Sequence, residues 1–192
     1  VKGNVTAGLT GTARASGTAL VEATDAARIE ALTIAGAVAA STGSGSGGGS
    51  GNTAFGGAGS ASANFIEGDT SARVTGTLDA GGSVSLRAVD SRGIDADAGS
   101  GALAVSTGGG GGSQSAIAAG AALAINEIRG AITAEQIGGS LTTGGNLLIE
   151  ARSAATIDSF ALGISGSVAS GSQGAISLAG AGSGNGNLTA LS

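Results

Sequence analysis

The chain has 192 residues, of which 40 are glycine, and it carries a formal net charge of -5. Hydrophobic residues make up 41% and charged residues 11%, whereas proline, cysteine, methionine, tryptophan, tyrosine and histidine are absent. This composition excludes an ordinary core rich in large side chains, and its hydrophobic content argues against disorder. The absence of a three-residue glycine period argues against collagen-like and silk-like folds. Without histidine or cysteine, there is no Ser-His pair, thiol nucleophile or imidazole-based metal centre.

Two patterns recur along the chain. The pattern of the opening segment, residues 1–7, returns at residues 66–72 and 128–134. Its seven positions are, in order: a β-branched residue; a charged residue; glycine; any residue; a β-branched residue or threonine; serine or threonine; and alanine. A second segment begins at Val21, Leu86 and Ile149, at offsets of 65 and 63, and each copy follows a glycine-containing turn. The sequence therefore predicts a structural repeat of 63 to 65 residues.

The repeat length changes only within glycine-rich segments. Between the first two repeats the offset falls from 65 to 62, and between the second and third it falls from 63 to 59, where Ser113–Ile117 matches Ser172–Ile176. Insertions and deletions are tolerated in surface loops but not in packed strands. We therefore predict loops on one face of the molecule at Gly43–Gly51, Gly108–Gly112 and Ser170–Ser172.

Between these loops, apolar residues alternate with small or polar ones, which is the period of a strand. One row of this alternation contains Ile117, Leu123 and Ile125, and the phase then shifts so that Ile128 and Ile132 continue it on even numbers. We predict a corner at Asn126, and likewise at Asn64, because asparagine tolerates the left-handed conformation. Ile128 and Ile132 are expected in the core and Arg129 outside. Further strands are predicted at Ser83–Val89, Gly93–Ala98, Ala102–Ser106 and Asn146–Ala151.

A helix is the alternative for part of this region, since Ala121, Ile125, Ile128 and Ile132 have helical spacing. Gly120, Gly130, Gly138 and Gly139 interrupt that pattern, and each glycine costs roughly 0.5 to 1 kcal/mol relative to alanine in a helix. Strands are therefore favoured.

The predicted fold class is all-β: a right-handed parallel β-helix (β-solenoid) built from 63–65-residue repeats, with two or three coils per repeat. Inward Ile, Leu, Val and Ala would stack on their equivalents one coil away. The sequence itself fixes neither the hand nor the coil count. Residues 1–192 are interpreted as one β-solenoid segment of a longer repeat protein, with a partial repeat at 1–16, repeats at about 17–81 and 82–144, and an incomplete repeat at 145–192.

Few residues are candidates for chemistry. Asp95 and Asp97 would share one side of a strand, as paired carboxylates in a glycosidase do, but Asp97 aligns with Leu32 and Phe160 in the other repeats. Asp95 instead belongs to a once-per-repeat acidic series with Glu30 and Asp158, which favours a solvated face. The segments Gly48–Thr53 and Gly56–Ala61 lack the aspartate of calcium-binding glycine repeats, and no Gly-Lys-Ser/Thr follows any glycine loop. We therefore predict no catalytic, cofactor-binding or metal-binding residue, and no enzyme activity.

Charges alternate between successive repeats in two series. The first is Lys2, Glu67 and Arg129, and the second is Glu22, Arg87 and Glu150. If equivalent positions lie within a Debye length, roughly 8 Å at physiological salt, alternation removes like-charge repulsion along the stack. The alternative is that the alternation of sign arose by chance, since only three repeats are compared.

Partners are constrained by charge and hydropathy. Seven arginines and one lysine are scattered singly, so no basic patch for nucleic acid is expected. The longest apolar run, residues 116–125, is too short to span a bilayer, so no membrane insertion by this segment is expected. The expected contacts are with neighbouring repeats of the same chain and with other copies of it.

The order of these features resembles a known family. The resemblance rests on the following order: a Gly-Gly turn, a short strand ending in alanine, an Ile-Asp-Ala segment, a Gly/Ala-rich loop, an alanine-rich strand leading to Asn-x-Ile, and then x-Gly-x-Ile-Thr-Ala. In this order the chain resembles the repeats of filamentous haemagglutinin-like and leukotoxin-type filamentous adhesins. These are very large bacterial surface proteins exported by two-partner or autotransporter routes. The resemblance implies a parallel β-helix shaft outside the outer membrane, at the cell surface, with adhesive or filament-forming roles. Host or cell surfaces would then be bound through other regions. The alternative is a self-assembling extracellular filament or sheath subunit.

Overall fold

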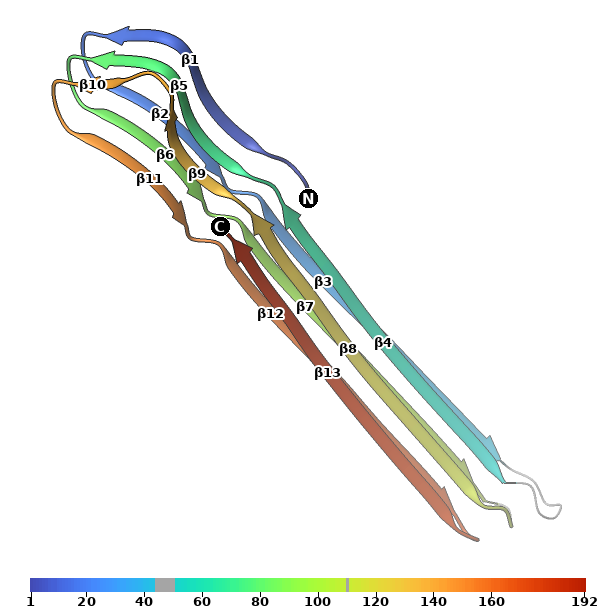
Figure 1. The fold of residues 1–192 in the computed structure, drawn as a ribbon. Coiled ribbons are helices and arrows are strands. Elements are labelled where there is room, and N and C mark those ends of the chain that lie inside the picture. Colours follow the sequence, from blue (N-terminus) through green and yellow to red (C-terminus); the bar gives the residue numbers. More distant parts are fainter. Residues whose placement is uncertain (44–50, 110) are drawn as a thin grey trace.

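The computed structural model describes residues 1–43, 51–109 and 111–192. Within these ranges the chain forms thirteen strands, all paired in parallel, and no helix (Figure 1). The all-β prediction is therefore confirmed, and the stacked parallel strands fit a β-helix. The helical alternative is excluded, because Ala121, Ile125 and Ile128 lie in one strand and Ile132 begins the next.

The strands form four sheets, and each sheet takes strands from three successive tiers of the chain: β1–β4, β5–β8 and β9–β13. The first sheet contains β1 (Val5–Ala15), β5 (Thr70–Ala80), β9 (Ile132–Ile137) and β10 (Leu141–Thr143); the second contains β2 (Ala19–Asp25), β6 (Val84–Asp90) and β11 (Leu147–Ser153). The third contains β3 (Arg28–Gly43), β7 (Gly93–Gly108) and β12 (Thr156–Gly171); the fourth contains β4 (Asn52–Glu67), β8 (Gln114–Gly130) and β13 (Ala175–Leu191). We call the first two sheets the head and the last two the arm, which extends away from the head in Figure 1.

Equivalent positions of successive repeats are direct neighbours in the sheets. Thr70 pairs with Val5 and Ile132, and Arg87 pairs with Glu22 and Glu150. Each repeat therefore passes only once through the four sheets, and the prediction of two or three coils per repeat is wrong. The predicted strands at Gly93–Ala98 and Ala102–Ser106 are one strand of 16 residues. The two arm strands of the middle tier, with 16 and 17 residues, take up about half of a repeat.

The interior of the arm is built from small side chains. Ala104 and Ala116 are fully buried between the two arm sheets, together with Ala54, Ala102 and Ala118. The middle tier is the most buried because it alone has a neighbouring tier on both sides. Larger side chains fill the head, where Val74, Leu78, Val84 and Leu86 form the core with Ala80.

The predicted phase shift at Asn126 does not occur. Even-numbered residues point inward from Ala116 through Asn126 to Ile128, whereas Leu123 and Ile125 point outward and are exposed. The outward placement follows from volume, since the narrow space between the arm sheets is filled by alanine, serine and glycine. Ile128 is buried as predicted, Arg129 is exposed, and Ile132 is half-buried against the Ala72 cluster.

The strands that flank the variable segments end together at the far end of the arm (Figure 1). These strands end at Gly43, Gly108 and Gly171, as expected for loops that share one face of the molecule. Residues 44–50 and 110 of the predicted loops lie outside the described residues. The third repeat is also in a different register from the one predicted: Ala175 pairs with Gln114, so the offset is 61 and not 59.

Candidate functional site

The junction between head and arm holds most of the polar side chains that the sequence singles out. A ladder of asparagine amides crosses its interior. Asn64 Nδ2 donates to Asn126 Oδ1 at 2.9 Å, and Asn126 Nδ2 donates to Asn187 Oδ1 at 3.0 Å. Asn126 is buried, and no residue other than glycine has a positive φ in the described part of the chain. Asn64 and Asn126 therefore join the tiers by side-chain hydrogen bonds, and their predicted role at left-handed corners is wrong.

A buried ion pair lies near this ladder. Arg92 is fully buried, and its Nε and Nη2 donate to Asp90 Oδ1 and Oδ2 at 2.9 and 3.0 Å. Arg92 Nη1 donates to the carbonyl oxygens of Gly68 and Arg129 at 2.8 and 3.3 Å, at the end of the opposite strands β4 and β8. The guanidinium thus satisfies the Gly68 carbonyl and is a second donor to the Arg129 carbonyl, which also accepts from the Gly68 N–H. All of these partners are groups of the chain itself, which indicates a structural role.

Sequence reasoning missed Arg92. The signal was present, because the strand register places alanine at the equivalent positions 27 and 155, next to the pairs Arg28–Gly93 and Thr156–Gly93. A charge that replaces alanine in the middle repeat alone marks a position where the interior differs.

The two predicted charge series form columns of neighbours. Arg87 lies between Glu22 and Glu150, with Arg87 Nη1 3.8 Å from Glu22 Oε1 and Arg87 Nε 3.1 Å from Glu150 Oε2. The predicted alternation therefore brings opposite charges within ion-pair distance. These side chains are about one-third exposed, so water screens the attraction only in part.

In the second column, Lys2, Glu67 and Arg129, only the first two residues form a direct ion pair, and Arg129 pairs with Glu127 of its own strand. Lys2 Nζ lies 2.6 Å from Glu67 Oε2, and this hydrogen-bonded ammonium lowers the pKa of Glu67. Arg129 is next to Glu67 in register, but its Nη2 lies 2.6 Å from Glu127 Oε2, and this contact raises the pKa of Arg129. Arg129 thus reaches Glu67 only through the longer-range charge interaction.

The acidic candidates for catalysis lie on an open surface. Asp95 and Asp97 face outward on the same side of β7, as predicted. Asp95 pairs in register with Glu30 and Asp158, and its Oδ2 is 3.6 Å from Arg28 Nη2. Asp97 lies between Leu32 and Phe160 in register. Asp95 thus has Arg28 and two carboxylates as neighbours, and it lines a small pocket with Arg28 and Asp158. Asp97 lies outside that pocket, so the structure does not bring Asp95 and Asp97 together around one site.

Of the two glycine-rich segments compared with calcium-binding repeats, one lies in a strand and the other is only partly described. Gly56–Ala61 is part of β4, where it pairs with β8, and Gly48–Thr53 falls partly outside the described residues. No group of three or more potential metal-ligating side chains occurs among residues 1–43, 51–109 and 111–192.

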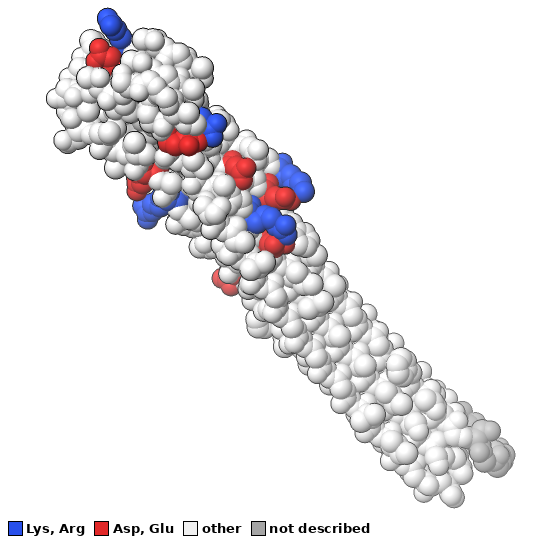
Figure 2. All heavy atoms as spheres, viewed as in Figure 1, with Lys and Arg blue, Asp and Glu red and all other residues white. Residues whose placement is uncertain are grey.

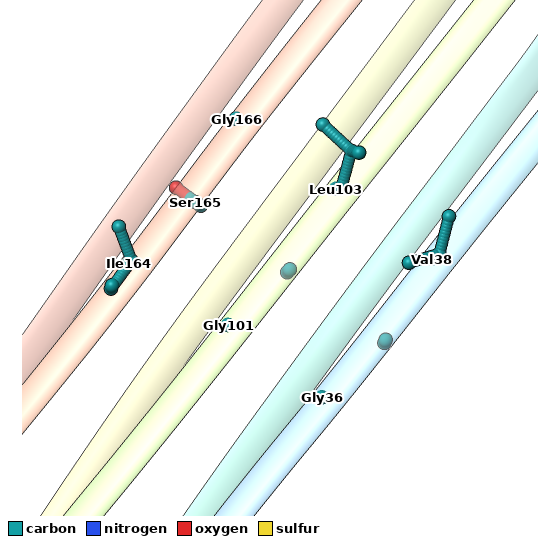
Figure 3. A pocket seen from close by; sticks show the side chains of 9 residues that line it. Gly36, Val38, Gly101, Leu103, Ile164, Ser165 and Gly166 are labelled. Carbon is teal, nitrogen blue, oxygen red and sulfur yellow. The ribbon is translucent and has the colours of Figure 1, made fainter.

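A groove crosses the outer surface of the arm sheet β3-β7-β12 (Figure 3). Gly36 and Gly101 form its floor, and Val38, Leu103 and Ile164 line it. Figure 2 shows that charged side chains gather over the head and the adjoining part of the arm, whereas the outer half of the arm has none in view. The sequence agrees, because residues 31–66, 98–126 and 159–192 contain no charged residue. The groove is thus an apolar feature of an uncharged surface.

Comparisons of the chain with protein-family models, curated proteins and solved structures found no match. Over the residues that the structure describes, no helix has the length and apolar character needed to cross a membrane.

Proposed function

We propose that this chain is a non-catalytic structural segment in the shaft of a large secreted bacterial surface adhesin, where it presents a binding region away from the cell. The observation that carries the proposal is the parallel, in-register pairing of successive repeats in all four sheets. Each tier offers the same strands to the next tier, so additional repeats extend the body without a new type of contact.

The proposed architecture is a right-handed parallel β-helix (β-solenoid) with one coil per repeat. Each coil would lengthen the shaft by only about 4.8 Å, whereas an arm strand of 16 residues spans about 53 Å. The shaft would therefore be a broad ribbon whose length depends on many repeats. Such a requirement suits a very large parent protein.

A role without catalysis is supported by the positions of the ionisable groups. Arg87 and Arg92 are engaged by carboxylates within the same chain, and Asp95 and Asp97 are exposed side chains that do not line a common pocket. A hydrolysis screen against a panel of bacterial and host glycans tests this part of the proposal. Turnover that is lost in Asp95→Asn would contradict it.

The alternative is a self-assembling filament or sheath subunit at the cell surface. The specific observation in its favour is the uncharged arm, whose outer surfaces expose Val38, Phe55, Ile164 and Leu178. Contiguous apolar patches of this kind mark association surfaces.

Small-angle X-ray scattering and negative-stain electron microscopy of the 192-residue chain separate these functions. A monodisperse elongated particle supports the shaft, long fibres support the filament, and a compact globular particle contradicts both. Labelling of intact source cells with an antibody against the chain tests the location. Signal that appears only after permeabilisation would contradict a surface role.

A further inference from the structure

The outward side chains of β3, β7 and β12 form one flat surface, which we call the outer arm face. Strand register arranges them in rows that run across the three strands. From the head toward the tip the rows are Leu32-Asp97-Phe160, Ile34-Gly99-Leu162, Gly36-Gly101-Ile164, Val38-Leu103-Gly166, Ala40-Val105-Val168 and Thr42-Thr107-Ser170. Except for Asp97 these side chains are uncharged, and all of the larger apolar ones but Val105 are solvent-exposed, with Val38 at 77% and Ile164 at 58%.

The two central rows complement each other in size. Where the row through Gly101 has glycine, glycine and isoleucine, the row through Leu103 has valine, leucine and glycine. A large side chain in one row thus stands next to a small one at the same strand of the other row. The groove in Figure 3 is the trough that this arrangement leaves beside the ridge of Val38 and Leu103.

We propose that two copies of this chain pack through their outer arm faces as an antiparallel dimer, with a two-fold axis that crosses the strands at Ala37, Ala102 and Ser165. This operation places each strand over its own copy and exchanges the two central rows. Val38 then enters the space over Gly36 of the second copy, and Leu103 enters the space over Gly101. The interface is isologous, so each contact occurs twice.

The third strand fits the same operation. Ile164 of one copy lies over Gly166 of the other, beside Leu103, whose side chain leans toward Gly166. In the row through Leu103, β3 and β7 carry large side chains and β12 carries glycine. The facing row of the second copy has glycine on β3 and β7 and isoleucine on β12, so the two rows are complementary. A surface of uniformly large side chains would not have this property.

The flanking rows continue the match of large with small on β3 and β7, whereas on β12 the same operation sets Leu162 against Val168 of the second copy. Ile34 faces Ala40 of the second copy, and Gly99 faces Val105. In the outermost rows Phe160 faces Ser170, and the Asp97 carboxylate faces Thr107, whose hydroxyl can donate a hydrogen bond to it. When the six rows of one copy face those of the other, the aromatic Phe160 therefore meets only a small side chain, and the one charged side chain, Asp97, has a hydrogen-bond donor opposite it.

Charge and area also favour this partner. The antiparallel arrangement places the charged head of each copy beyond the arm tip of the other, which separates the two heads, whereas a parallel arrangement would oppose like-charged heads. The face measures about 36 Å along the strands and about 14 Å across them, or about 500 Å² per copy. A total near 1,000 Å² is the lower limit for a specific interface, so we expect a reversible dimer that dissociates on dilution through the micromolar range.

Row-swap variants test the register of this dimer by sedimentation velocity on the 192-residue chain. Gly101→Leu sets leucine against Leu103 of the second copy, and Leu103→Gly leaves glycine against glycine, so each single variant should weaken dimerisation at least tenfold. The double variant Gly101→Leu/Leu103→Gly exchanges ridge and trough and should restore most of the affinity. A Cβ at Gly101 meets no atom within 4 Å, so a side chain can leave the backbone there without a clash.

Gly180→Leu is the matched control, because Gly180 lies on β13 in the other arm sheet and also has open space at its Cβ. Its dimer affinity should equal that of the unmodified chain. The Gly36→Leu/Val38→Gly pair repeats the test on β3 if Leu103→Gly fails to fold by circular dichroism. A chain that stays monomeric up to millimolar concentration, a double variant no tighter than the singles, or an equal loss in Gly180→Leu would overturn the proposal. The dimer goes beyond the shaft function, and particles that are elongated but monomeric would refute it while leaving that function intact.

Discussion

Reversing the charge of Arg87 tests whether the alternating columns stabilise the stack. Arg87 faces Glu22 and Glu150 at 3.8 and 3.1 Å, which corresponds to an attraction of about 1.1 and about 1.3 kcal/mol in bulk water. The side chains are about one-third exposed, and measured surface pairs retain only a fraction of the Coulomb energy. We therefore expect Arg87→Gln to lower the free energy of unfolding by about 0.5 to 1 kcal/mol.

Arg87→Glu removes the same attraction and adds repulsion between three carboxylates in neighbouring strands. The expected loss is about 1 to 2 kcal/mol, or a fall in Tm of roughly 3 to 6 °C for a chain of this length. Urea unfolding followed by far-UV circular dichroism measures it, since the chain has no tryptophan for fluorescence. Sodium chloride at 1 M should shrink the difference between the variants.

The inverted column is the control for side-chain shape. Replacing both glutamates by lysine in the Arg87→Glu background restores alternation and should recover most of the lost stability. Arg14→Glu provides a comparison at an exposed pair, Arg14–Asp79 at 3.9 Å, where the effect should be smaller. If Arg87→Glu unfolds at the same urea concentration as the unmodified chain, or if the inverted column is no more stable than Arg87→Glu alone, the electrostatic reasoning is refuted.

Three further changes probe the junction. Arg92→Met should cost about 3 to 5 kcal/mol because it leaves the buried carboxylate of Asp90 without a cation, whereas Arg92→Met/Asp90→Asn should be more stable than the single variant in the same urea titration. Asn126→Ala removes two interior hydrogen bonds and should cost about 2 to 3 kcal/mol by urea unfolding; an unchanged midpoint would contradict the amide ladder. The pKa of Glu67 is lowered by Lys2, so the stability from this pair is present above the ordinary value of 4.5 and is lost as pH falls through the folded-state value. Lys2→Ala should reduce this acid dependence of Tm, and identical pH profiles would rule the pair out.

The repeat was accessible from sequence because equivalent residues must stack on one another. The offsets that align Leu86 with Val21 and Ile149 are the offsets of the paired strands. The charges of Glu22, Arg87 and Glu150 were found by the same alignment. Chain-length differences located the arm tip, since an insertion there changes no pairing.

Alignment of the repeats did not predict the number of coils per repeat or which face of the arm strands points inward. Gly99 and Gly101 resemble a turn in the sequence, but both lie within β7, where glycine leaves open space on the outer surface. Placing Leu123 and Ile125 inside would require a wider gap between the arm sheets than their alanine neighbours set. A strand with apolar residues in both rows does not reveal which row is buried, because that depends on the distance to the facing sheet.

The outward apolar residues have a second explanation, which is stabilisation of their own sheet. In register, Leu103 lies beside Val38 and Gly166 and is 41% exposed, whereas Val38 at the sheet edge is 77% exposed. Neighbours along the row therefore shield an outward leucine without any dimer. This explanation and the dimer make different predictions for Gly101→Leu, which adds an apolar neighbour within its row. Sheet stabilisation predicts a higher Tm at every protein concentration, while dimerisation predicts a lower affinity that Leu103→Gly then repairs. The size match across the two-fold axis, rather than apolar content alone, is what the row exchange tests.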